Sequence, residues 1–148
     1  MTDIDMRVAV NAPAETTFAA MSDWPRQQEW MLGTKVRVTS GDGSSEGSEL
    51  VAVTGVGPLA FADSMRITTW EPPLRCDVVH TGKLVRGTGE FLVRPTSATT
   101  SEFEWIEHLD VPFGVVGRLG WSLTGPAFQW GLRRSLNRFT RFAEGYRR

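Results

Sequence analysis

The sequence predicts an α+β fold, in which a curved antiparallel sheet of seven strands is wrapped around one long C-terminal helix. Three observations predict it. One β-rich run precedes two short helical segments, six further β-rich runs are separated by Gly, Ser, Asp and Pro clusters, and residues 126–145 carry a long apolar stripe with helical spacing. Because the sheet must bury one face and this helix offers the only long stripe, the two are expected to pack together.

The first thirty residues combine one strand with two short helices. Residues 4–10 are rich in β-forming residues, and Asn11-Ala12-Pro13 ends this run. Pro13 suits the first position of a helix because its missing N–H would be unpaired there, and this helix is expected to end near Ser22. The segment from Asp23 to Trp30 predicts a second short helix.

A meander of six strands is expected to follow. Turn-forming clusters recur between the β-rich runs, and the prolines of Glu71-Pro72-Pro73 cannot donate hydrogen bonds to a neighbouring strand. The predicted strands cover residues 35–40, 47–56, 61–70, 75–81, 85–94 and 99–109.

The C-terminal helix is the firmest element of the prediction. Its apolar face carries Phe128, Leu132, Leu136, Phe139, Ala143 and Tyr146, and arginines occupy the opposite face. The preceding residues 112–125 are apolar but contain several glycines, which lower helix propensity, so the sequence leaves their conformation open.

Length and composition limit the class of protein. The 148 residues fit one domain spanning 1–148, and 16 basic against 17 acidic residues give no net field that would attract nucleic acid. The single cysteine, Cys76, suits a reducing compartment, and the acidic N-terminus resembles neither a signal peptide nor a membrane span. A cytoplasmic protein without a cofactor is expected.

Several segments of the chain, in their order, resemble the polyketide cyclase/dehydrase and lipid-transport family of the START-like (SRPBCC) superfamily, which includes the birch pollen allergen. These segments are Val10-Asn11-Ala12-Pro13-Ala14-Glu15, Asp23-Trp24-Pro25 with Trp30, Trp70-Glu71-Pro72-Pro73, Gly87-Thr88-Gly89-Glu90-Phe91, Trp105-Ile106-Glu107 and the Leu136-x-x-Phe139 helix. The resemblance implies the helix-grip fold and a cavity for lipids, polyketides or other apolar molecules, with catalysis in only some members. It also leaves open an antitoxin-like role with a protein partner.

One acidic residue of the predicted hairpin is the candidate catalytic residue. A loop of residues 95–99 would set Phe91 opposite Phe103 and Gly87 opposite Glu107. Glu107 then lies among aromatic side chains on the inner face, where a desolvated carboxyl group can act as a general acid or base, or bind a ligand hydroxyl. Two alternatives are that it points to solvent or that an arginine neutralises it.

The same register has a second consequence on the outer face. It places Glu90 opposite Glu104, an unfavourable pair of like charges that a shift of the strand alignment by one step would avoid, and the alignment is kept.

The other polar residues give no metal or nucleotide motif. Neither His80 nor His108 combines with Cys76 in a metal-binding spacing, and both histidines are interpreted as surface or satisfied core residues.

The principal hypothesis is a binding protein for a hydrophobic small molecule, and the alternative is a cyclase or dehydratase that uses Glu107. The candidate ligand-binding residues on inner faces are Trp30, Met65, Ile67, Val79, Phe91, Phe103, Trp105, Phe128 and Leu132.

One tryptophan of the last helix is predicted away from the core. Trp130 projects on the arginine-rich side, where a large aromatic side chain has no core to join. A transient contact with an anionic membrane and a homodimer interface are the two interpretations left open.

Overall fold

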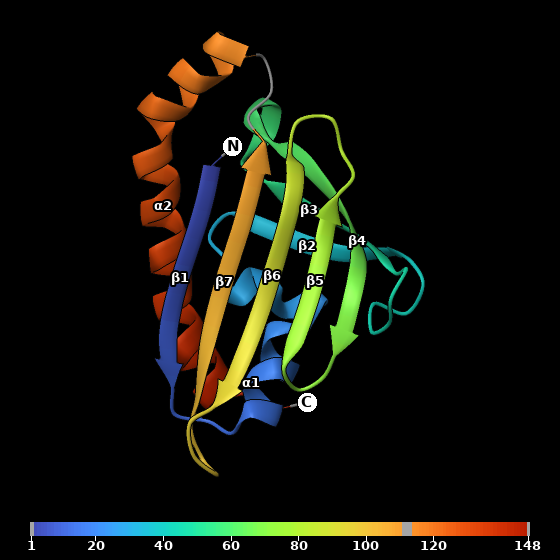
Figure 1. Cartoon of the computed structure of the whole chain (residues 1–148), viewed down its shortest axis with the longest axis vertical. Helices are drawn as coiled ribbons and strands as arrows, with labels where there is room; N and C mark the ends of the chain where they lie inside the picture. Colours follow the sequence, from blue (N-terminus) through green and yellow to red (C-terminus); the bar gives the residue numbers. More distant parts are fainter. Residues whose placement is uncertain (1, 111–113, 148) are drawn as a thin grey trace.

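The computed structural model describes residues 2–110 and 114–147, with the side chains of residues 2, 59, 114–124 and 128 outside the description. Seven antiparallel strands form one sheet in the order β1-β7-β6-β5-β4-β3-β2, and the sheet curves so that β2 and β3 lie behind β5 and β6 (Figure 1). The strands are β1 (Thr2–Val10), β2 (Thr34–Ser40), β3 (Glu49–Thr54), β4 (Phe61–Glu71), β5 (Arg75–His80), β6 (Arg86–Pro95) and β7 (Ser101–Asp110). The predicted α+β fold and all seven strands are confirmed.

The three predicted helices occur in the predicted order. They are α1 (Ala14–Met21), the 3₁₀ helix η1 (Trp24–Glu29) and α2 (Gly114–Glu144). The short 3₁₀ helix η2 (Gly57–Leu59) is an addition that the sequence did not predict. The long α2 lies along the sheet beside β1, while α1 and η1 lie near its C-terminal end (Figure 1). This arrangement is the helix-grip architecture.

The long helix begins twelve residues earlier than its apolar stripe predicted. Pro126, expected at the helix start, lies inside α2, where a proline removes one backbone hydrogen bond and favours a bend. The stripe itself is confirmed for Leu132, Leu136 and Phe139, which are buried. The predicted position of Phe128 lies outside the described side chains.

The register of the β6–β7 hairpin differs from the prediction by two residues. Thr96 N–H donates to Thr100 O at 3.0 Å, so the turn is centred one residue later than expected, and Phe91 pairs with Trp105. A two-residue shift leaves every side chain on the predicted face, because side chains alternate with a period of two.

The corrected register also removes the expected clash of like charges. Glu104 lies opposite Leu92, and its carboxylate accepts hydrogen bonds from Arg7 Nε at 3.0 Å and from Arg94. Glu90 instead accepts a hydrogen bond from Arg75 Nη2 at 2.7 Å. Arginines on neighbouring strands therefore neutralise the carboxylates of the outer face.

Candidate functional site

A cavity of about 580 Å³ lies between the inner face of the sheet and α2. Its wall is mostly apolar and is built by η1, by strands β2 to β7 and by the middle of α2. Phe61 and Leu84 line it and are also 39% and 50% exposed, which places the opening near the start of β4 and the β5–β6 connection. A largely apolar cavity with few polar groups is the usual form of a small-molecule site.

Four of the nine predicted ligand-binding residues line this cavity, as does Glu107. They are Met65, Phe91, Trp105 and Leu132. Each points inward from a different element: β4, β6, β7 and α2. The structure therefore brings these positions, which are far apart in the sequence, around one space.

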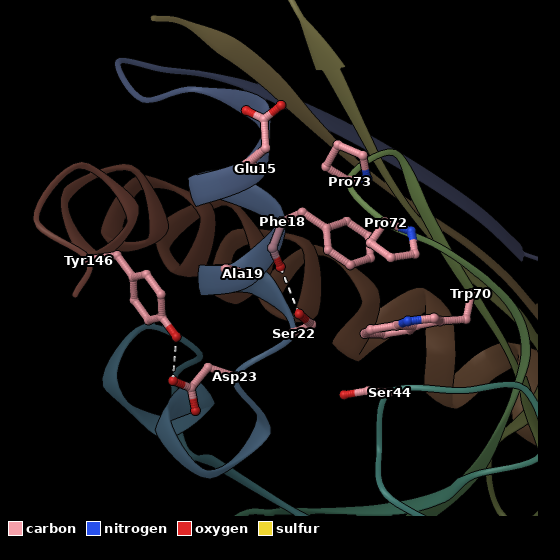
Figure 2. A pocket seen from close by; sticks show the side chains of 10 residues that line it. All are labelled: Glu15, Phe18, Ala19, Ser22, Asp23, Ser44, Trp70, Pro72, Pro73 and Tyr146. Atoms are coloured by element: carbon pink, nitrogen blue, oxygen red, sulfur yellow. Dashed lines mark hydrogen bonds between the residues drawn. The ribbon is translucent and has the colours of Figure 1, made fainter. Parts of the chain in front are cut away.

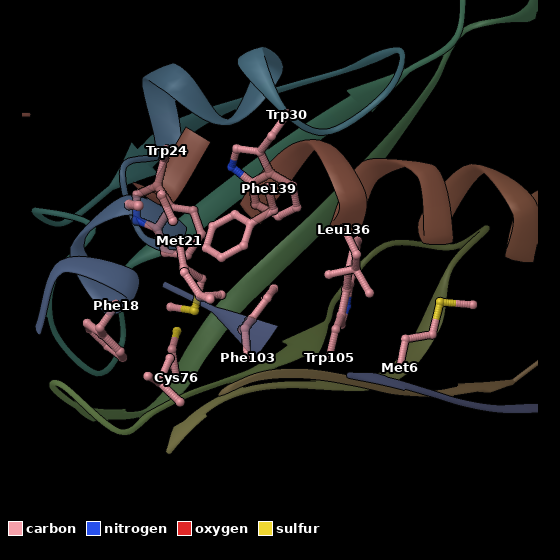
Figure 3. Packing of buried hydrophobic residues seen from close by; sticks show 14 of the residues in the cluster. Met6, Phe18, Met21, Trp24, Trp30, Cys76, Phe103, Trp105, Leu136 and Phe139 are labelled. Carbon is pink, nitrogen blue, oxygen red and sulfur yellow. The ribbon is translucent and has the colours of Figure 1, made fainter. Parts of the chain in front are cut away.

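Three other predicted residues are buried in the core and do not line the cavity. The indole of Trp30 makes edge-on contacts with Phe139 and Phe103, with ring centroids 4.8 and 6.4 Å apart, and the Phe103 and Phe139 rings are 4.7 Å apart (Figure 3). Ile67 is 1% exposed. These side chains fill the space between sheet and helix instead of bordering a void.

Val79 was predicted on the inner face, and the structure places its neighbours there. Cys76, Val78 and His80 line the cavity, and side chains alternate along β5, so Val79 lies on the other face. Adjacent valines gave the sequence prediction no means to choose between the two faces. The ring of Phe128 lies outside the described side chains.

A hydrogen-bonded polar network interrupts the apolar wall. His80 of β5 bridges two carboxylates: its Nδ1 is 2.8 Å from Asp63 Oδ1 of β4, and its Nε2 is 2.9 Å from Glu107 Oε2 of β7. The indole N–H of Trp105 donates to the other Glu107 oxygen at 2.9 Å. We call Asp63, His80 and Glu107 the carboxylate–histidine network.

The network holds His80 in its charged form. Burial by itself lowers the pKa of His80, but the hydrogen bonds and the charges of Asp63 and Glu107 outweigh this effect and raise the pKa to about 10. At neutral pH the imidazolium therefore donates both N–H groups. A histidine in this state is a proton donor or a fixed positive charge, and it cannot serve as a general base.

A glycine of the neighbouring strand makes room for the Glu107 carboxylate. Gly89 of β6 pairs with Glu107, and a Cβ atom at Gly89 would lie 2.9 and 3.0 Å from the two carboxylate oxygens. Real Cβ atoms almost never come so close to another atom. Gly89 thus allows the carboxylate to lie over β6 and reach His80.

Sequence reasoning identified Glu107 but missed its partners. It left open an arginine as the neutralising group, and the structure shows His80 in that place. His80 of β5 pairs with Met65 of β4. Asp63 lies two residues before Met65, so its side chain is on the same face of β4 and can reach His80. Only the register of β4 against β5, which the sequence did not yield, could have revealed the pair.

The cavity wall holds further polar side chains, among them Cys76 and Gln27. The Cys76 thiol is buried, and desolvation raises its pKa to about 12, so it is not a reactive nucleophile at neutral pH. Gln27 of η1 is only 2% exposed, and its side-chain amide has no hydrogen-bond partner among the residues described. Within the described ranges, no three His, Cys, Asp or Glu side chains are arranged to hold a metal ion.

A second depression lies on the surface between α1, the β4–β5 turn and the C-terminus. This groove of about 830 Å³ is larger but more open than the cavity, and it is bordered by Phe18, Trp70 and Pro72 (Figure 2). At its edge Tyr146 donates a hydrogen bond to Asp23 Oδ2 at 2.7 Å. Because it encloses a ligand less and lacks the carboxylate–histidine network, we take the internal cavity as the candidate site.

Solved structures share this architecture. The Zhui aromatase/cyclase from Streptomyces sp. R1128 superposes with a TM-score of 0.80 at 13% identity, covering 97% of this chain and 93% of that one. A protein of Thermus thermophilus gives 0.80 at 12% identity, covering 96% and 97%. The di-domain aromatase/cyclase BexL of the BE-7585A biosynthetic pathway gives 0.73 at 16% identity over 95% of this chain, which spans only 46% of that protein.

At these identities the structural likeness shows the fold alone. No curated protein sequence matches the chain. Among the described residues, no helix is both long and apolar enough to cross a bilayer.

The sequence matches the polyketide cyclase/dehydrase and lipid transport family over residues 1–144. The chain therefore belongs to the polyketide cyclase/dehydrase and lipid-transport family.

Proposed function

We propose that the protein binds a hydrophobic small molecule in the cavity between the sheet and α2. The observation that carries the proposal is the cavity itself, an apolar space of about 580 Å³ that neighbouring side chains leave unfilled. Transfer of apolar surface from water into such a space gains roughly 25 cal/mol per Å² before the costs of association. Membership of a family named for polyketides and lipids supports the proposal.

A plug in the cavity tests this function. Gly131 of α2 lines the cavity, and a Cβ atom there would meet no atom within 4 Å, so the side chain of Gly131→Phe starts in open space beside the cavity that its ring should occupy. Titration with the apolar fluorophore N-phenyl-1-naphthylamine should give saturable binding to the wild type and at least tenfold weaker binding to Gly131→Phe. The control Gln129→Phe adds the same ring at an exposed position of the same helix and should bind like the wild type. Equal binding by all three proteins would exclude the cavity as the site.

A second function, a cyclase or dehydratase, is favoured by the carboxylate–histidine network. In this proposal a Glu107 carboxylate oxygen takes a proton from the carbon beside a ligand carbonyl, and an enolate forms. The same proton then goes to a β-hydroxyl group, which leaves as water while a carbon–carbon double bond forms. Asp63 and the His80 imidazolium hold the Glu107 carboxylate in position.

A chromogenic probe separates catalysis from binding. Dehydration of 4-hydroxy-4-phenylbutan-2-one forms a conjugated enone, whose absorbance can be followed directly. If the protein is a dehydratase of this kind, the wild type accelerates the reaction and Glu107→Gln loses at least a hundredfold of the rate. Equal rates for the two proteins, with fluorophore binding retained, would remove Glu107 as a catalytic residue and leave the binding function standing.

A further inference from the structure

The charged groups of the cavity wall are strongly biased toward one sign. Asp63 and Glu107 supply carboxylates, Asp110 adds another at the opening, and no lysine or arginine is among the described residues that line the cavity. His80 is the one cationic group of this described wall, and both of its ring nitrogens are already engaged by the two carboxylates. A ligand carboxylate or phosphate would therefore meet negative charge without a free cation to pair with.

The hydrogen-bonding capacity that remains in the network is that of an acceptor. His80 occupies one oxygen of each carboxylate, and Trp105 donates to the second oxygen of Glu107. Each carboxylate oxygen has two lone pairs, so both groups can accept further hydrogen bonds, whereas every N–H of the network is already used. A ligand hydroxyl or amine fits this end of the cavity.

Gln27 is another polar group of the cavity wall. It comes from η1 rather than from the strands, it is 2% exposed, and its amide has no partner among the described residues. Because Gln27 lines the cavity, a ligand group inside it can form a hydrogen bond with this amide. The amide carries no charge to pair with an anion, and it can both donate and accept a hydrogen bond.

Resting on the proposed binding function, we infer that the cavity selects amphiphiles whose polar group donates hydrogen bonds and carries no negative charge. Alcohols, phenols and amines belong to this class, and fatty acids and phosphorylated lipids do not. The inference concerns the choice between ligands of equal apolar size, which the apolar wall alone does not make.

Competition among three ligands with the same ten-carbon chain tests this selectivity. N-phenyl-1-naphthylamine bound to the wild type is displaced at pH 7.5 by decan-1-ol, decylamine or decanoate, each below its aggregation limit. The alcohol and the amine should displace the fluorophore at concentrations at least tenfold lower than decanoate. Asp63→Asn, which replaces one carboxylate by a neutral amide of the same shape, should reduce this ratio at least threefold.

The outcomes separate the two proposals. If the wild type does not bind the fluorophore, the binding function and the selectivity are both overturned. If the fluorophore binds and decanoate competes as well as decan-1-ol, the binding function stands and the selectivity is overturned. If Asp63→Asn does not fold, Gln27→Leu serves as the second variant. We expect it to weaken decan-1-ol binding at least threefold. Unchanged competition by decan-1-ol would exclude Gln27 as a ligand contact.

Discussion

The interface between the sheet and α2 is solid in one half and hollow in the other. In the solid half the ring of Trp30 packs edge to face on Phe103 and Phe139, whose rings are tilted against each other, and all three are fully buried (Figure 3). In the hollow half the wall includes small residues such as Ala52 and Gly131, which leave the cavity open. Both halves are apolar, so the difference between a core and a binding site here comes from side-chain volume rather than hydrophobicity.

Truncation of a large side chain should distinguish the halves most strongly. Phe139→Ala removes a ring that packs on two others, and we expect it to lower the free energy of unfolding by about 3–5 kcal/mol. Leu132→Ala removes a side chain that already borders the cavity, and we expect a loss of about 2 kcal/mol. Urea unfolding followed by circular dichroism measures both, and equal losses would contradict the division into two halves.

The polar network of the hollow half should make its stability depend on pH. The pKa of His80 is raised to about 10 in the folded protein, above its ordinary value of 6.5. The folded state thus holds this proton more tightly than the unfolded state does. The stability that His80 contributes is fully present below pH 6.5 and is lost as pH rises to about 10.

We therefore expect His80→Gln to cost about 2 kcal/mol at pH 6 and much less at pH 10. Urea midpoints for the wild type and the variant at both pH values give this comparison. Phe139→Ala is the control from the solid half, because its loss arises from packing and should not change with pH. A His80→Gln loss of the same size at both pH values would show that the proton is not held as the geometry indicates.

A single methyl group should disturb the hollow half with a smaller cost in stability. Gly89→Ala places a Cβ atom against the Glu107 carboxylate, which Trp105 and His80 hold in place, so the carboxylate must move. We expect a loss of about 1 kcal/mol. The control Gly82→Ala has only an ordinary contact at 3.7 Å and should be close to neutral. Thermal unfolding of both variants measures the difference, and an equally neutral Gly89→Ala would mean that Glu107 moves freely.

The fold could be predicted from the sequence because the period of apolar residues states which face of each element is buried. All seven strands and the stripe of α2 with Leu136 followed from it. The start of α2 could not be predicted in this way. Glycines and Pro126 lower the helix propensity of this segment, but tertiary packing still allows a helix there.

The candidate site was less accessible than the fold, since it depends on strand register and on side-chain volume. Glu107 was identified because its inward face follows from alternation alone, which a two-residue shift does not alter. Its pairing with His80 requires the register of β5 through β7, and the choice between Val78 and Val79 requires the orientation of β5. Periodicity also cannot separate Trp30, which fills space, from Trp105, which borders it.

The outer side of α2 is expected to give the smallest effect on stability. Trp130 is 63% exposed, and the guanidinium of Arg134 lies 5.7 Å from the centre of its ring. Because it contributes little to the core, Trp130→Ala should change the free energy of unfolding by less than about 0.5 kcal/mol. An exposed tryptophan beside an arginine favours contact with an anionic membrane surface, so the variant should bind phosphatidylglycerol vesicles more weakly than the wild type does.

Cosedimentation with vesicles, beside size-exclusion chromatography, measures this contact and the oligomeric state together. Leu74→Ala is the matched control, because Leu74 is 47% exposed in the β4–β5 turn and lies outside the cavity wall. A change of oligomeric state in Trp130→Ala alone would assign the tryptophan to a homodimer interface instead. Vesicle binding and oligomeric state that match the wild type would remove Trp130 from both roles and leave ligand exchange to the opening near Phe61 and Leu84.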